Sequence, residues 1–291
     1  NTIPFSESIG FIADLRDPDD IDYVTDVTAH ETAHQWWGHQ IVGADQQGAT
    51  ALSETLAQYS SMRVMRLMYG PDHVRKFLKY ELDSYLRARG GEAAEEQPLV
   101  SVEPNQGYIH YRKGSLVMYR LADEIGEDAV NRALRSLLAK YAFKGAPYPT
   151  SLDLVAALRA QAPADKQRLI TDLFDKITFY DLRATQAVAH RRPDGRYDVA
   201  LTVSARKFYA NGVGAEHPAP MNEDVDIGLF TAKPGEAGFG RASVLVLEKE
   251  PVVSGVHTWR FVTAVKPSFA GIDPYNELID RDSDDNVVAV R

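Results

Sequence analysis

The chain of 291 residues is long enough for one large domain or two ordinary ones, and its 44% apolar residues suffice for a substantial core. With 32 Lys and Arg against 41 Asp and Glu, its net charge is −9, and no stretch forms a basic patch, so nucleic acid is not expected as a partner. The lack of cysteine excludes disulfides and thiolate metal sites, and no apolar run approaches the roughly 18 residues that a membrane helix needs.

The beginning of the chain mixes β-branched and aromatic residues with Pro and Gly over residues 1–22, which predicts short strands. A helix is predicted next, over residues 25–41, with Thr25 or Asp26 as its N-cap. Because the sequence starts at Asn1 without Met and already reads as structured, we expect a fragment of a longer protein. The sequence predicts neither the oligomeric state nor the compartment.

The helix over residues 25–41 contains the pattern His-Glu-x-x-His, at His30, Glu31 and His34. Residues four apart on a helix lie about 40° from eclipsed, so the two histidines project from one face and can share one metal ion. Glu31 is too far round the helix to be a third ligand, but it is close enough to hold a water molecule on the metal. The alternative is a chance match on an ordinary amphipathic helix.

Three other side chains near this pattern have simpler explanations. His39 lies about 140° further round the helix than His34 and is expected to face away from the metal, as a surface or loop histidine. Trp36 and Trp37 are expected to pack the helix into the core.

A third ligand is available from the next helix, predicted over residues 52–69 after a polar loop at 42–50. Glu54 lies near the start of this helix, and the loop can fold the helix back antiparallel to the first. Zinc sites with two histidines require one more protein ligand and an open coordination position. The alternative is a glutamate placed at a helix N-terminus because the macrodipole favours it there.

The remaining sequence predicts more helices and then strands. Thr150 and Asp153 form a partial capping box at the start of one of the helices, and the helices cover residues 72–88, 112–124, 127–141, 151–161 and 164–176. Beyond a boundary near 178–186, apolar and polar residues alternate with period two, which indicates an all-β sandwich. The predicted fold class is therefore α+β, with a mainly helical domain at 1–180 and a β-sandwich domain at 185–291.

Four motifs in order resemble those of the aminopeptidase N family of zinc peptidases, which are gluzincins with a thermolysin-like catalytic domain. The first is the strand motif Pro4-Phe5-Ser6-Glu7-Ser8-Ile9-Gly10, which keeps the Glu and the following Gly of the family pattern. The others are His30-Glu31-Thr32-Ala33-His34-Gln35-Trp36, Glu54 at the next helix start, and Tyr111-Arg112-Lys113-Gly114. The resemblance is greatest to bacterial forms fused to ABC-transporter permease-like membrane proteins.

The resemblance implies one Zn²⁺ per chain, held by His30, His34 and Glu54. Zinc in such a site acidifies a bound water and polarises the scissile carbonyl. Glu31 is then the general base, which takes the proton of the water and passes it to the leaving amine.

Two further residues receive roles from the same resemblance. Tyr111 is the expected hydrogen-bond donor to the oxyanion. Glu7 is expected to bind the free α-ammonium group of a peptide substrate, which makes the enzyme an aminopeptidase that removes N-terminal residues. The alternatives are a core tyrosine and an exposed strand glutamate.

A second functional hypothesis is a peptide-binding, catalytically weak module of a larger membrane-associated protein. It is motivated by Pro4 and Ser8, which replace the family's Gly and Asn, and by the absence of the family's flanking domains from this sequence. The resemblance also implies a soluble fragment of a bacterial membrane-anchored protein, with a membrane-spanning region of the same full-length protein as a partner.

Overall fold

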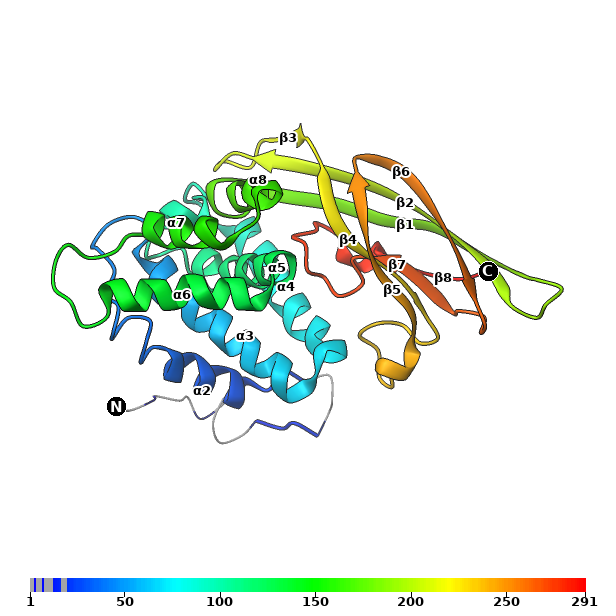
Figure 1. The fold of residues 1–291 in the computed structure, drawn as a ribbon, viewed down its shortest axis with the longest axis horizontal. Coiled ribbons are helices and arrows are strands. Elements are labelled where there is room, and N and C mark those ends of the chain that lie inside the picture. The colour runs from blue at the N-terminus through cyan, green and yellow to red at the C-terminus, as the bar shows by residue number, and fades with distance from the viewer. Residues whose placement is uncertain (1–2, 4–6, 8–12, 17–19) are drawn as a thin grey trace. The chain divides into compact units, whose positions relative to one another are not determined.

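The computed structural model describes residues 3, 7, 13–16 and 20–291. The chain forms two compact units: one comprises 1–70, 80–177 and 210–215, and the other 71–79, 178–209 and 216–291. The first unit is mainly helical and the second is mainly β-sheet, so the α+β class is confirmed (Figure 1). The domain ranges 1–180 and 185–291 stay a prediction, because each unit also takes a short segment from the other range.

The helical unit begins with α2 (Tyr23–Ala33), followed by a π-helical turn η1 (Ala51–Thr55) that leads into α3 (Leu56–Tyr69). After a 3₁₀ turn η2 (Pro71–His73), α4 (Val74–Gly91) starts in the β unit and continues in the helical one. The later elements are listed here in order: η3 (Leu99–Ser101), η4 (Tyr108–Lys113), α5 (Gly114–Ile125), α6 (Glu127–Tyr141), α7 (Ser151–Gln161), η5 (Ala164–Lys166), α8 (Gln167–Ile170) and η6 (Thr171–Asp175).

The helices of this unit differ in how much of their surface they bury, and α5 is buried on all sides over residues 114–122. In α6 the buried residues recur three to four apart, which places one apolar stripe against α7 and α5. α3 lies between α2 and α5, and its Met62 and Met65 are almost fully buried. The predicted capping box of α7 is confirmed, since the Asp153 carboxylate accepts the backbone N–H of Thr150 at 3.0 Å.

The β unit contains two four-stranded sheets. In one, β1 (Ile177–Arg191) neighbours β2 (Tyr197–Ala210), which pairs with β3 (Glu216–Ala219) and antiparallel with β6 (Gly255–Thr263). The other has the order β5 (Val244–Val253), β4 (Asn222–Phe230), β7 (Phe269–Ile272), β8 (Val287–Ala289), all antiparallel, with 3₁₀ turns η7 (Arg241–Ser243) and η8 (Ser283–Asp285) nearby in sequence.

One hydrophobic core joins the two sheets, because the buried alternate residues of β1 and β2 pack with those of β4, β5 and β7. This is the arrangement of a sandwich. The predicted boundary region 178–186 is itself strand rather than linker, since β1 runs through it.

Candidate metal centre

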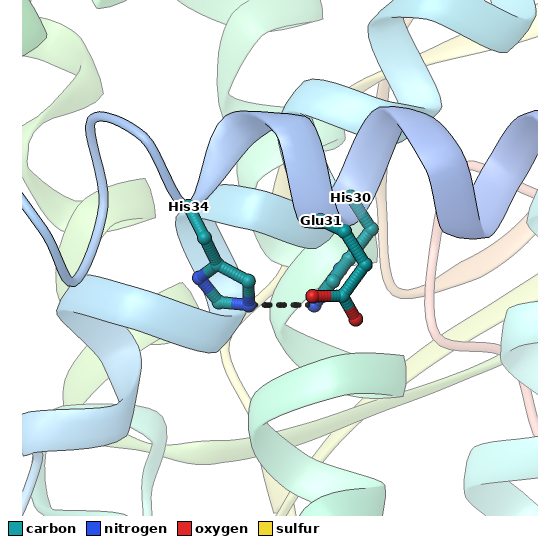
Figure 2. Close-up of side chains that lie close together, drawn as sticks. All are labelled: His30, Glu31 and His34. Carbon is teal, nitrogen blue, oxygen red and sulfur yellow. Dashed lines mark hydrogen bonds between the residues drawn. The ribbon is translucent and has the colours of Figure 1, made fainter. Parts of the chain in front are cut away.

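The two histidines of the motif, His30 and His34, lie at the end of α2. Asp22 caps the helix by accepting the backbone N–H of Thr25 at 3.0 Å, so the predicted caps, Thr25 and Asp26, are wrong. His30 is buried near the end of α2, and His34 is its C-cap, with the two Nε2 atoms 3.1 Å apart (Figure 2). The helical spacing therefore brings both imidazoles together, as expected.

The helix ends earlier than predicted, at Ala33 rather than near 41. Gly38 has φ +108°, which a continuing helix does not allow, and its N–H donates to the Ile41 carbonyl in a tight turn. The turn buries Trp37, as expected, but leaves Trp36 44% exposed, so the prediction that both tryptophans enter the core is half wrong. A helical rotation angle therefore does not apply to residues after Ala33.

Glu54 completes a three-atom cluster. It lies in η1, and its Oε2 is 3.4 Å from His30 Nε2 and 3.5 Å from His34 Nε2. With the 3.1 Å between the two nitrogens, these distances define a nearly equilateral triangle. Ligands about 2.0–2.1 Å from a tetrahedral zinc lie about 3.3 Å from one another. The donor types and their separations thus fit zinc.

The charges in the cluster are strongly coupled. Burial raises the pKa of Glu54, but the neighbouring His30 and His34 rings and the Tyr111 hydroxyl outweigh it and hold that pKa well below its usual range. In return, the Glu54 carboxylate raises the pKa of His34 to about 8. A metal ion entering this cluster competes with a bound proton, so metal affinity will depend on pH.

Each histidine is oriented through its other ring nitrogen. His30 Nδ1 is 2.9 Å from Gln58 Oε1, and His34 Nδ1 is 2.8 Å from the Trp37 carbonyl oxygen. An oxygen acceptor at Nδ1 favours the tautomer whose Nε2 carries the free lone pair, which is the form that binds a metal here.

Glu31 lies beside the two histidines but less close than Glu54. One potential ligand atom from each of His30, Glu31 and His34 lies within 4.8 Å of the other two (Figure 2). Within the described part of the chain, this is the group that the spacing of such atoms singles out as a possible metal site. Glu54 Oε2 is within 3.5 Å of both nitrogens, so Glu54 is placed where it could act as a third ligand to a metal ion held by the two histidines.

Tyr111 reaches the cluster from η4, a second π-helical turn. Its ring centroid is 5.6 Å from that of His30. Burial and a hydrogen bond with the Glu54 carboxylate raise the pKa of Tyr111 well above its ordinary value, so the phenol keeps its proton. π-helical turns occur mostly as single insertions, often at functional sites, and here two of them carry Glu54 and Tyr111.

A buried hydrogen bond links the two π-helical turns η1 and η4. Thr55 is fully buried and donates its hydroxyl hydrogen to the His110 carbonyl oxygen at 2.6 Å. Gly114 is needed at this contact, because a Cβ there would lie 2.5 Å from Thr55 Oγ1. The contact fixes the spacing between the segments that carry Glu54 and Tyr111.

Lys113, which belongs to the same sequence motif as Tyr111, forms a buried ion pair that attaches η4 to the rest of the helical unit. Its side chain is 1% exposed, and its Nζ lies 3.1 Å from Glu96 Oε1. Glu96 also accepts hydrogen bonds from Tyr85 and Arg89, both at 2.5 Å. The lysine therefore holds η4 against the interior of the helical unit.

A cleft of about 690 Å³ opens beside the cluster. His39, expected to be a surface or loop histidine, is exposed in the turn after α2 and also lines this cleft. The residues around the cleft are Ile3, Glu31, Thr32, His34, Gln35, Gly38, His39, Ser53 and Glu54.

Glu7 is exposed and is not among the described residues that line this cleft. Its backbone is helical, so the strand expected around it is absent at this described position. Most of the strand motif, including Pro4, Ser8 and Gly10, lies outside the described residues.

Three residues that the sequence did not identify, Gln58, Glu81 and Arg112, form a chain of hydrogen bonds that ends at His30. Gln58 donates through Nε2 to Glu81 Oε1 at 3.2 Å, and Arg112 Nη1 lies 3.1 and 3.2 Å from the two Glu81 oxygens. Burial raises the pKa of Glu81 to about 7, and the Arg112 guanidinium opposes that rise. Gln58 follows Glu54 by four residues, so helical spacing could have identified it, whereas Glu81 carries no comparable signal.

None of the helices in the described residues is both long and apolar enough to cross a membrane.

Two crystal structures of a point mutant of an M1 zinc metallopeptidase from Deinococcus radiodurans, one bound to a Tyr-Ser-Ala substrate, match with 21% and 22% identity and a TM-score of 0.41. Each match covers 51% of this chain and 32% of the solved chain, so this sequence spans about a third of the length of those proteins. Among curated proteins, no sequence matches. The model of the peptidase family M1 domain matches residues 6–176, more than half of the sequence, and the chain therefore belongs to peptidase family M1.

Proposed function

We propose that this chain is a zinc-dependent peptide hydrolase that removes N-terminal residues from peptides. The observation that carries the proposal is the triangle of His30 Nε2, His34 Nε2 and Glu54 Oε2, with sides of 3.1, 3.4 and 3.5 Å. Membership of peptidase family M1 supports both the metal and the reaction class.

The residues around the triangle suit hydrolysis. When bound, zinc supplies Lewis acidity to a water molecule and to the scissile carbonyl. Glu31, adjacent to the ligands, takes the proton from the attacking water and transfers it to the nitrogen of the leaving amine as the C–N bond breaks. Tyr111, whose raised pKa keeps its proton in place, donates a hydrogen bond to the oxyanion.

The aminopeptidase specificity is a separate part of the proposal. It assigns Glu7 to the α-ammonium group of the substrate, on the basis of the sequence motif around Glu7. A cleft of about 690 Å³ is large enough for part of a peptide next to the cluster. Attachment to a bacterial permease-like membrane protein is also proposed, and it rests on the resemblance alone.

The test uses the zinc-loaded protein with aminoacyl-arylamides and short peptides, each with a free or an acetylated N-terminus. We expect turnover of the free forms and none in Glu31→Gln, which should still bind zinc. Equal activity of that variant would refute the mechanism. Equal rates on acetylated peptides would remove the role of Glu7 and indicate an endopeptidase.

The same assay addresses the alternative function. If the zinc-loaded wild-type protein binds peptides without hydrolysing them, the chain is a peptide-binding module instead. The proximity of Glu31 and Tyr111 to the metal ligands disfavours this alternative, since binding alone requires neither.

A further inference from the structure

We infer that Glu81, paired with Arg112, is a positioning residue that sets the side-chain amide of Gln58 and thereby keeps the His30 ring in its metal-binding tautomer. This inference rests on the proposed function in that it takes His30 as a zinc ligand. Its elements are the hydrogen bonds from His30 to Gln58, from Gln58 to Glu81 and from Arg112 to Glu81.

The first step concerns the proton on His30. Gln58 Oε1 lies 2.9 Å from His30 Nδ1, and both residues are buried, at 5% and 7% exposure. An amide oxygen can only accept, so this contact requires the ring proton on Nδ1. Nε2 is then left with its lone pair, and it is Nε2 that lies 3.4 Å from Glu54.

The second step concerns the amide itself. The amide of Gln58 could be turned by half a rotation, which would present its NH₂ group to His30 Nδ1 and move the ring proton to Nε2. That proton would occupy the position needed for the metal. A neighbouring group must therefore hold the Gln58 amide in the orientation in which its oxygen faces His30 Nδ1.

Glu81 supplies that constraint. Its Oε1 accepts from Gln58 Nε2 at 3.2 Å and from Arg112 Nη1 at 3.1 Å, so this oxygen faces two donors and offers no proton to Gln58. In the turned orientation two oxygens would face each other in the interior, where such a contact is costly. The carboxylate of Glu81 therefore selects the orientation in which the amide oxygen faces His30.

Arg112 keeps Glu81 in that role. The Glu81 side chain is 3% exposed, and a buried carboxylate without a partner tends to take up a proton. Arg112 Nη1 lies within 3.2 Å of both carboxylate oxygens, and its guanidinium stacks 5.1 Å from the Tyr80 ring centroid. Because Arg112 follows Tyr111 in η4, the same ion pair links the metal ligand on α2 to the turn that carries the proposed oxyanion donor.

The experiment compares Glu81→Gln with a matched control, Glu124→Gln. Glu124 is also a buried carboxylate of the helical unit, with a side chain 2% exposed, but it belongs to α5, where Arg120, 2.7 Å away, and Lys166 are its ion-pair partners. Both substitutions keep the shape and remove a buried charge. Only the first allows the Gln58 amide to turn, because a glutamine at position 81 can donate as well as accept.

Two quantities are measured. Nitrogen-15 NMR of the metal-free protein reports which ring nitrogen of His30 carries the proton, and competition with a chelator reports zinc affinity. We expect wild type and Glu124→Gln to hold the proton on Nδ1, and Glu81→Gln to show a mixture of tautomers with zinc affinity about 10- to 100-fold lower. In a Gln58→Leu background, Glu81→Gln should lower zinc affinity no further, since its effect passes through Gln58.

The inference is overturned if Glu81→Gln keeps the wild-type tautomer and affinity, or if Glu124→Gln lowers affinity equally. If Glu81→Gln does not fold, Gln58→Leu decides: a proton that stays exclusively on Nδ1 overturns the inference, and a mixture supports it. The measurement of the His30 tautomer needs neither zinc nor peptide. A zinc-loaded protein that proves inactive would therefore refute the proposed hydrolase function without deciding whether Glu81 is a positioning residue.

Discussion

Glu54 supplies the negative charge of the ligand triangle, so its replacement by Gln should remove most of the stabilisation that zinc gives the helical unit. Glu54 Oε2 lies 3.4 and 3.5 Å from the two histidine nitrogens. Loss of a group that merely orients a ligand costs about 10- to 100-fold in metal affinity. Loss of a ligand itself should therefore cost at least about 100-fold.

Linkage converts that loss into a melting temperature. At a free zinc concentration about 100 times its dissociation constant, zinc stabilises the wild-type protein by about 2.7 kcal/mol. A variant that binds about 100-fold more weakly gains only about 0.4 kcal/mol under the same conditions. For a unit of this size, these values correspond to zinc-induced increases in Tm of about 5–11 °C and about 1 °C.

Differential scanning calorimetry with buffered zinc, and again with a chelator, measures both increases. Glu92→Gln is the matched control, because Glu92 is an exposed glutamate of the same unit, outside the cluster. It should show the wild-type increase. An equal increase in wild type and Glu54→Gln would refute the assignment of Glu54 as a ligand.

Three further outcomes follow from the structure. Tyr111→Phe should lower kcat about 10²- to 10³-fold with little change in KM, measured by steady-state kinetics; an unchanged kcat would contradict the oxyanion role. Thr55→Val leaves the buried His110 carbonyl without its donor and should cost about 1–3 kcal/mol of unfolding free energy, whereas Thr55→Ser keeps the bond; equal losses in urea unfolding would contradict this. In the β unit, burial raises the pKa of Asp280 to about 7, above its unfolded value, so the native state holds a proton that the unfolded state releases, and stability should fall as pH rises from about 4 to about 7. Asp280→Asn should flatten that slope in thermal unfolding at several pH values, and an unchanged slope would contradict it.

The parts of the site that depend on local geometry could be predicted from the sequence. His30 and His34 are four residues apart, and helix periodicity alone brings their rings together. The structure places Glu54 near the two histidines as expected, but the connection is longer than the expected loop at 42–50, since α2 ends at Ala33 and η1 starts at Ala51. The structure brings Tyr111 to the cluster, as its motif implied, although nothing in its local spacing required this.

The prediction about the end of α2 failed for a physical reason. The predicted end of α2 is wrong because the apolar pattern continues through Trp37, whereas the regular helix already ends at Ala33 and the positive φ of Gly38 excludes a helix that runs on to 41. His39 is exposed in a turn, as expected of a surface or loop histidine, although the helical rotation angle used to place it does not apply to residues that are not helical.

The hydrogen-bonded support of His30 could not be derived from the sequence. Glu81 and Arg112 are 31 residues apart, and their meeting depends on how α4 packs against η4. A charged residue on a helix that looks surface-facing in sequence gives no sign that it is 3% exposed. Such pairs become visible only when the tertiary structure is known.

The most direct test of the metal centre is anomalous diffraction at the zinc edge from crystals grown with zinc. We expect one zinc ion per chain, about 2.0–2.2 Å from His30 Nε2, His34 Nε2 and a Glu54 carboxylate oxygen. An anomalous peak elsewhere, or these three side chains pointing apart with no peak between them, would contradict the account.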